Sequence, residues 1–232
     1  MAPILGCTGE KRKDGALIRA RNAPLGAIAV RASIREPGRK NFTIAHEIGH
    51  FVLPGHERGR IACTASEVGE WTDAPDEENL EREANEFAAE LLMPLERVED
   101  TARGALPSLN VVEKIAREFA VSLSAAAWRY CEVTSEPCAI VWSMDGAVQW
   151  AKRSDCFPYF LSGPRPLEEG TFAYACFAGE KVPGRPRAVP AHLWISSASS
   201  DAEIRLFEQS KSLPSYRSVI TLLWIRKNAE TD

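Results

Sequence analysis

His46-Glu47-Ile48-Gly49-His50 is the most informative stretch of this sequence. Two histidines four residues apart on a helix lie roughly 40° apart around its axis and about 6 Å along it. Both imidazoles can therefore bind one metal ion from the same face. Glu47, beside the first histidine, can reach a water in an open coordination position. The pentad predicts metal-assisted peptide hydrolysis, with His46 and His50 as ligands and Glu47 as general base.

The residues around the pentad favour a half-buried helix. Apolar side chains recur at helical spacing beside the two histidines, at Ile44, Ile48, Phe51 and Val52. Gly49 costs about 1 kcal/mol in a helix interior, which is understandable if another backbone or a substrate approaches closely there. We expect Thr43 or Asn41 to cap the start of the helix.

A catalytic zinc site needs a third protein ligand from elsewhere in the chain. The other histidines, His56 and His192, are candidates. A better source is the segment 76–94, which predicts a second helix that starts after Pro75 and stops at Pro94. This segment is rich in glutamates. The position of each glutamate around the helix axis indicates which one can face the metal.

The expected buried stripe of this second helix selects one glutamate. The stripe consists of Leu80, Ala84, Phe87, Ala88, Leu91 and Leu92. At ~100° per residue, Glu81 lies roughly 65° from the centre of the stripe and is the first choice. Glu77 also faces inward, but in the first turn, and is the second choice. Asn85, one turn after Glu81, is placed to hydrogen-bond a ligating histidine. Three further glutamates are expected to face solvent: Glu83, Glu86 and Glu90. The small side chains in the stripe allow the first helix to pack closely.

Two blocks of sequence together resemble a known family. Phe-Thr-Ile-Ala-His-Glu-Ile-Gly-His over 42–50, followed by Glu-Arg-Glu-Ala-Asn-Glu-Phe-Ala-Ala-Glu-Leu-Leu-Met-Pro over 81–94, is similar to the ImmA/IrrE metallo-endopeptidases. The resemblance implies that the pentad supplies two ligands and the general base, and that Glu81 is the third ligand. It also implies a cytoplasmic protease that cleaves a helix-turn-helix (XRE-type) transcriptional repressor, in stress responses or mobile-element control. Zinc fits His/His/Glu best, although Mn²⁺ or Fe²⁺ can bind such a site.

Composition limits the other functional classes. The net charge is −4 and no dense basic run occurs, which argues against binding nucleic acid through a broad electrostatic patch. No apolar stretch reaches the length of a membrane span, and the N-terminus lacks the apolar block of a signal peptide. The six cysteines include no CxxC pair, so free thiols are expected. We therefore expect a cytoplasmic protein without a membrane partner.

The expected fold class is α+β, with three regions. Residues 1–106 form a mainly helical, zincin-like metallopeptidase domain, in which 27–31 is the one clear strand ahead of the pentad. Residues 107–134 form a helix-turn-helix-like segment with a turn at 120–122. Residues 135–232 form a smaller, β-rich and sensor-like C-terminal domain.

Hydrophobic patterning refines the second half of the chain. An Asp-Gly turn at 145–146 predicts a β-hairpin from the strands that flank it. Further strands are predicted at 171–177, 192–195, 203–209 and 218–225. In the helix-turn-helix-like segment, the second helix offers mainly alanines, Trp128 and Arg129, which favours packing over DNA contact. His192 and Tyr216 are more typical of an ordinary β-domain than of oxyanion stabilisers.

A second function belongs to another class. The chain could be a non-catalytic regulatory protein that senses a metal or ligand and binds a repressor or DNA without cutting either. Cleavage of a repressor that depends on Glu47 separates the protease from this alternative.

Overall fold

A computed structural model describes residues 14–19, 25–56, 77–195 and 204–226. Contacts group the chain into two compact units, and each is described by itself. The first comprises residues 1–94 with the short segment 119–122, and the second comprises the remaining residues to the C-terminus. The three domains expected from sequence stay a prediction. Among the described residues, no helix has both the length and the apolar character needed to cross a bilayer.

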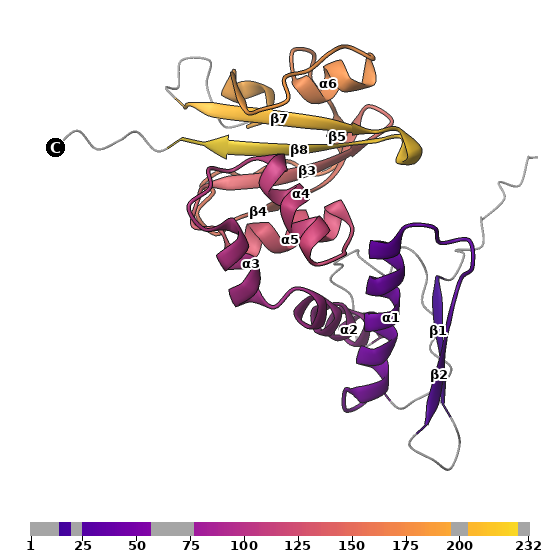
Figure 1. The fold of residues 1–232 in the computed structure, drawn as a ribbon. Helices are drawn as coiled ribbons and strands as arrows, with labels where there is room; N and C mark the ends of the chain where they lie inside the picture. The colour runs from indigo at the N-terminus through magenta and orange to yellow at the C-terminus, as the bar shows by residue number, and fades with distance from the viewer. Residues whose placement is uncertain (1–13, 20–24, 57–76, 196–203, 227–232) are drawn as a thin grey trace, which may run out of the picture. The chain divides into compact units, whose positions relative to one another are not determined.

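In the first unit, a β-hairpin and a second helix both pack on one central helix (Figure 1). Strands β1 (Gly15–Arg19) and β2 (Gly26–Val30) pair antiparallel, with Gly15 opposite Val30. Helix α1 (Pro37–Val52) contacts both strands and also packs on α2 (Glu77–Leu92). The strand predicted at 27–31 is confirmed as β2. Strand β1 was missed, because five residues next to a charged segment give a weak alternation signal.

Helix α1 starts earlier than its predicted caps. Pro37 occupies the first turn, where its missing N–H costs nothing, and Glu36 at the N-cap makes no side-chain capping bond. The prediction of Thr43 or Asn41 as the cap is therefore wrong. Thr43 Oγ1 instead donates to the carbonyl of Arg39 within the helix, and Asn41 Nδ2 donates to the carbonyl of Ala120.

The two helices of the first unit meet at Gly49. A Cβ built on Gly49 would lie 3.1 Å from Phe87 Cδ1 and 3.2 Å from Ala84 Cα. The close approach of α2 explains why position 49 is a glycine. The approach of another backbone was one of the two reasons that the sequence offered. The expected burial of Val52 and Leu91 is wrong, since they are 53% and 52% exposed. The buried face of α1 carries its polar residues instead, because that face packs on α2 and the hairpin.

Enlarging Gly49 should loosen this helix pair. We expect Gly49→Val to lower the free energy of unfolding by about 1–3 kcal/mol, because the added methyls have no room beside Phe87 and Ala84. Val52→Ala, at an exposed position of the same helix, should change it by less than about 0.5 kcal/mol. Chemical denaturation followed by circular dichroism measures both. Equal effects of the two substitutions would contradict the close packing at Gly49.

The second unit is an antiparallel sheet combined with helices, so the chain as a whole is α+β. The sheet has six strands in the order β5-β4-β3-β8-β7-β6. Its strands are β3 (Cys138–Met144), β4 (Ala147–Arg153), β5 (Arg165–Pro166), β6 (Arg187–Val189), β7 (Leu206–Leu213) and β8 (Ser218–Ile225). The helices are α3 (Leu95–Ala102), α4 (Leu109–Glu118), α5 (Leu123–Val133) and α6 (Phe172–Phe177), with 3₁₀ turns at Ala191–Leu193 and Pro214–Tyr216.

Several predictions for the second unit are confirmed and two are wrong. The hairpin β3–β4 turns at Asp145 and Gly146, whose φ angles of 50° and 80° are those a two-residue turn requires. The strand at 218–225 and the two helices around 120–122 are also present. The strand predicted at 171–177 is the helix α6, because Thr171 caps it by accepting from Tyr174 N. The strand predicted at 192–195 is largely a 3₁₀ turn.

Consecutive residues of β7 point to opposite faces of the sheet and make different contacts there. On one face, Gln209 Oε1 accepts from Leu109 N of α4 at 2.7 Å. On the other face, Glu208 is buried, and its carboxylate accepts from Trp194 Nε1 at 2.9 Å and Ala173 N at 2.7 Å. Glu208 therefore connects β7 to the start of α6 inside an apolar core.

Glu208 predicts a pH dependence of stability. Burial raises the pKa of Glu208 above 4.5, although hydrogen bonds from Trp194 and Ser210 oppose the shift. The unfolded chain then loses this proton at lower pH than the folded protein, so the contribution of Glu208 to stability falls as pH rises above about 4.5. In Glu208→Gln this slope should vanish. Unfolding free energies of both proteins across this range measure the difference, and parallel profiles would contradict the prediction.

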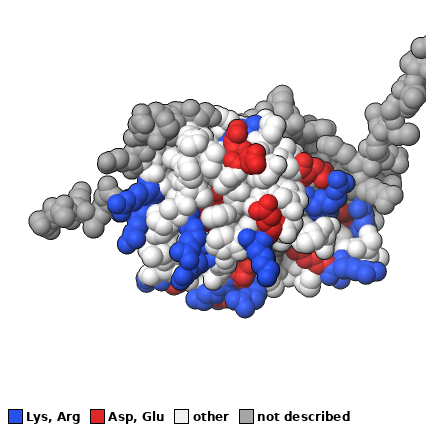
Figure 2. Space-filling view, turned by 90° about the horizontal axis from the view of Figure 1, so that it is seen from above, with Lys and Arg blue, Asp and Glu red and all other residues white. Residues whose placement is uncertain are grey.

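Helix α5, the second helix of the predicted helix-turn-helix-like segment, presents no basic surface suited to contact DNA. Arg129 of α5 is 7% exposed and pairs with Glu132 at 3.1 Å. Trp128 packs edge-on against Trp150 of β4, with ring centroids 5.7 Å apart. On the described part of the face in Figure 2, Lys and Arg are interspersed with Asp, Glu and uncharged residues. These observations agree with the expectation that α5 packs within the protein.

Candidate metal centre

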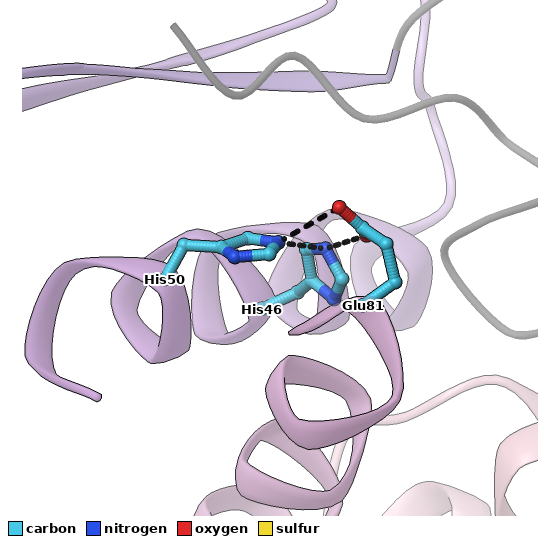
Figure 3. Close-up of side chains that lie close together, drawn as sticks. All are labelled: His46, His50 and Glu81. Carbon is cyan, nitrogen blue, oxygen red and sulfur yellow. Dashed lines mark hydrogen bonds and ion pairs between the residues drawn. The ribbon is translucent and has the colours of Figure 1, made fainter. Parts of the chain in front are cut away.

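Helices α1 and α2 bring three predicted ligands together (Figure 3). His46 Nε2 and His50 Nε2 lie 3.0 Å apart. Glu81 of α2 reaches across, with Oε2 3.1 Å from His46 Nε2 and Oε1 3.3 Å from His50 Nε2. Both histidines are fully buried, whereas the Glu81 side chain is 22% exposed. The cluster therefore lies between the two helices, and Glu81 is its partly exposed member.

The donor set and its spacing fit a tetrahedral metal ion. Ligand atoms about 2.0–2.1 Å from a tetrahedral ion lie about 3.3 Å from one another. The separations of 3.0, 3.1 and 3.3 Å are close to this value. Two imidazoles and one carboxylate leave a fourth position for water, as in catalytic zinc sites. His46, His50 and Glu81 can thus hold zinc, and their roles as ligands remain a prediction.

Electrostatics keep Glu81 in its ligating form. Burial alone would raise the pKa of this carboxyl, but hydrogen bonds and charge interactions with His46 and His50 outweigh burial and lower the pKa to about 2. A carboxylate must be ionised to bind a metal. Glu81 therefore needs no deprotonation at neutral pH before it can act as a ligand.

Asn85 orients the first histidine. Its Oδ1 lies 3.0 Å from His46 Nδ1, and its side chain is buried on the same helix as Glu81. Since an amide oxygen can only accept, Nδ1 of His46 must donate. The lone pair of a neutral His46 then lies on Nε2, the atom that faces the cluster. This is the contact expected for a residue that supports a ligand.

Glu47 is buried on α1 beside the first histidine and faces the hairpin. It is 0% exposed, and a Cβ built on Gly15 of β1 would lie 2.5 Å from Glu47 Oε1. Any larger residue at position 15 would therefore displace this carboxylate. The close approach of β1 fixes one side of the space that Glu47 occupies.

A buried carboxylate, paired with two partly exposed arginines, connects β1 to its neighbours. Asp14, which precedes β1, has a fully buried side chain. It accepts from Arg39 Nε in the first turn of α1 at 2.7 Å and pairs with Arg31, just after β2, at 3.1 Å. The backbone of Arg31 also donates to the carbonyl of Asp14 at 2.9 Å. Asp14 thus connects both strands of the hairpin to the helix that carries Glu47.

The other sequence candidates do not join this cluster in the described structure. The side chain of Glu77 lies outside the described residues. His192 and Tyr216 belong to the second unit, in its two 3₁₀ turns. His56 is close, but its ring contacts His50 Nδ1 rather than the face where Glu81 lies.

Sequence reasoning missed the role of Glu83. The prediction that it faces solvent is confirmed, since 47% of the side chain is exposed, but its Oε2 also lies 3.0 Å from His56 Nε2. The missed signal is the position of His56 just beyond the end of α1. From there a side chain can return to the helix end and meet its neighbour α2.

Comparison with known proteins agrees with this geometry. A family model described as the IrrE N-terminal-like domain, of the M78 peptidases, matches residues 11–130, which include the hairpin, both helices of the site and the helices α3 and α4. The radiation response metalloprotease IrrE of Deinococcus deserti is 31% identical over 110 residues. The aligned region is 47% of this chain and 37% of that relative, so the match spans little more than a third of the relative's length. Because the family model covers just over half of the chain, this protein belongs to the peptidase family that shares the IrrE N-terminal-like domain.

Proposed function

We propose that this protein is a cytoplasmic, zinc-dependent endopeptidase that hydrolyses a peptide bond in a helix-turn-helix transcriptional repressor. The observation that carries the proposal is the convergence of His46, His50 and Glu81 within 4.8 Å, beside the buried Glu47. Membership of a peptidase family supports the reaction class.

The residues divide the chemistry between them. His46, His50 and Glu81 would hold the ion, with the imidazole of His46 oriented by Asn85. Zinc at such a site polarises the scissile carbonyl and lowers the pKa of a bound water to about 7. Glu47 takes the proton of the attacking water and returns it to the leaving amine nitrogen. Its neighbours hold the carboxylate in place, since Gly15 of β1 packs against it.

The substrate class rests on the family resemblance. ImmA/IrrE endopeptidases act on helix-turn-helix repressors, and the sequence blocks at 42–50 and 81–94 carry the likeness. The relative from Deinococcus deserti is named for a radiation response. A role in a stress response is therefore proposed for this chain as well.

The test is metal-dependent cleavage of a purified repressor. The zinc-loaded protein is incubated with the helix-turn-helix repressor encoded nearest to it, beside chelator-stripped protein and stripped protein given zinc again. We expect discrete fragments in the first and third reactions only, with an unrelated unstructured protein in the same tube left intact. Mass spectrometry of the fragments identifies the bond. A stable complex without fragments in all three reactions would instead favour the regulatory binding protein.

A further inference from the structure

A chain of hydrogen bonds leads from the metal centre to the surface through two residues that the reaction does not use. His50 Nδ1 lies 2.9 Å from His56 Nδ1, and His56 Nε2 lies 3.0 Å from Glu83 Oε2. His50 and His56 are fully buried, whereas Glu83 is 47% exposed. This series of hydrogen bonds joins His50 near the end of α1, His56 beyond that end, and Glu83 of α2.

The donor and the acceptor of each hydrogen bond can be assigned by starting at Glu83, the surface end of the series. The carboxylate of Glu83 can only accept, so His56 Nε2 carries the hydrogen. In neutral His56, Nδ1 is then the acceptor, and His50 Nδ1 must donate to it. The lone pair of His50 is therefore placed on Nε2, which faces His46 and Glu81 at 3.0 and 3.3 Å.

We propose that His56 and Glu83 are positioning residues that hold His50 in the tautomer and ring orientation needed to bind the metal. The inference deepens the proposed function and rests on its metal site. It gives the two ligating histidines different supports: buried Asn85 for His46, and the pair His56–Glu83 for His50. The ligand at position 50 therefore depends on a carboxylate that solvent can reach.

The cost of losing this support is predictable. Partners that orient metal-bound histidines typically contribute about 10–100-fold to metal affinity. We expect His56→Phe, which keeps a planar ring and removes both nitrogens, to weaken zinc binding within that range. Glu83→Ala should weaken it in the same direction, near the lower end. Glu83→Gln should retain most of the affinity, because its amide oxygen can still accept from His56 Nε2.

A matched control is available on the same helix. Glu86 has a 48% exposed side chain, and within the described part of the chain it pairs with Arg82, one turn away on the same helix, at 2.9 Å. Glu86→Ala makes the same chemical change as Glu83→Ala at nearly the same exposure. It should leave zinc affinity unchanged. Circular dichroism confirms that each variant folds, and Glu83→Ala keeps the test decisive if His56→Phe does not fold.

Two measurements report on the inference without any substrate. Competition with a chromophoric chelator gives the zinc affinity of each variant. Nitrogen-15 NMR of the zinc-loaded protein follows the Nδ1–H of His50, which should exchange slowly with solvent in the wild type and faster in His56→Phe, where its acceptor is lost. Zinc affinities of His56→Phe and Glu83→Ala equal to that of Glu86→Ala, with an unchanged exchange rate of the His50 Nδ1–H, would overturn the inference.

These results are separate from those for the proposed function. A wild-type protein that binds zinc but cleaves no repressor would contradict the endopeptidase and would leave the roles of His56 and Glu83 standing. A protein that cleaves repressor while His56→Phe keeps full zinc affinity would support the endopeptidase and overturn the positioning roles.

Discussion

Glu47→Gln is expected to lower the rate of repressor cleavage by about 10²–10⁴-fold while the protein keeps its zinc. General acid–base catalysis by one positioned side chain contributes an acceleration of this size. Glutamine keeps the shape of the buried side chain but cannot take a proton from water at neutral pH. Single-turnover cleavage followed by gel or mass spectrometry gives the rate, and elemental analysis gives the zinc content.

The position of Glu47 makes its control straightforward. It adjoins the proposed ligand His46 but is not part of the His46–His50–Glu81 cluster, so metal loss should not accompany the substitution. Glu86→Gln, on the exposed side of α2, should cleave at the wild-type rate. A Glu47→Gln variant that retains zinc and more than a tenth of the wild-type rate would assign the proton transfer to another group.

Glu81→Ala should cause the largest loss of metal binding among single substitutions on α2. The carboxylate contacts both histidine Nε2 atoms, and its low pKa of about 2 shows how strongly His46 and His50 stabilise its charge. Losing a direct ligand should exceed the loss for an outer partner, so zinc affinity should fall by more than about 100-fold. Chelator competition measures the change.

The comparison with neighbouring glutamates makes this result specific. Glu83→Ala should lie between Glu81→Ala and the exposed Glu86→Ala, because Glu83 reaches the site through His56 rather than by direct contact in the described structure. Equal zinc affinity in all three variants would remove Glu81 from the ligand set. Repressor cleavage should follow zinc occupancy in each variant, which links the two measurements.

Local patterns predicted most of what identifies this protein. The four-residue spacing of His46 and His50 and the helical position of Glu81 depend only on helix geometry, which a sequence carries directly. The strong turn at Asp145-Gly146 and the β-branched run at 218–225 were likewise predictable. Short elements were less so: β1 was missed, and 171–177 became the helix α6 because a Thr171 cap and Glu208 on β7 satisfy its first amides.

The sequence by itself predicted the candidate metal-binding pentad and the glutamate-bearing helix that would complete it, and it carried the resemblance to the family. Only the tertiary structure decided what surrounds these residues. Contacts between residues far apart in the chain place Gly15 against Glu47, join Asp14 to Arg39, and connect His50 through His56 to Glu83. Such contacts arise from how segments pack, and the periodicity of a helix shows which of its faces is buried but not which side chains of distant segments meet that face. The candidate ligands were therefore predictable from spacing, whereas the contacts that orient each of them depended on the fold.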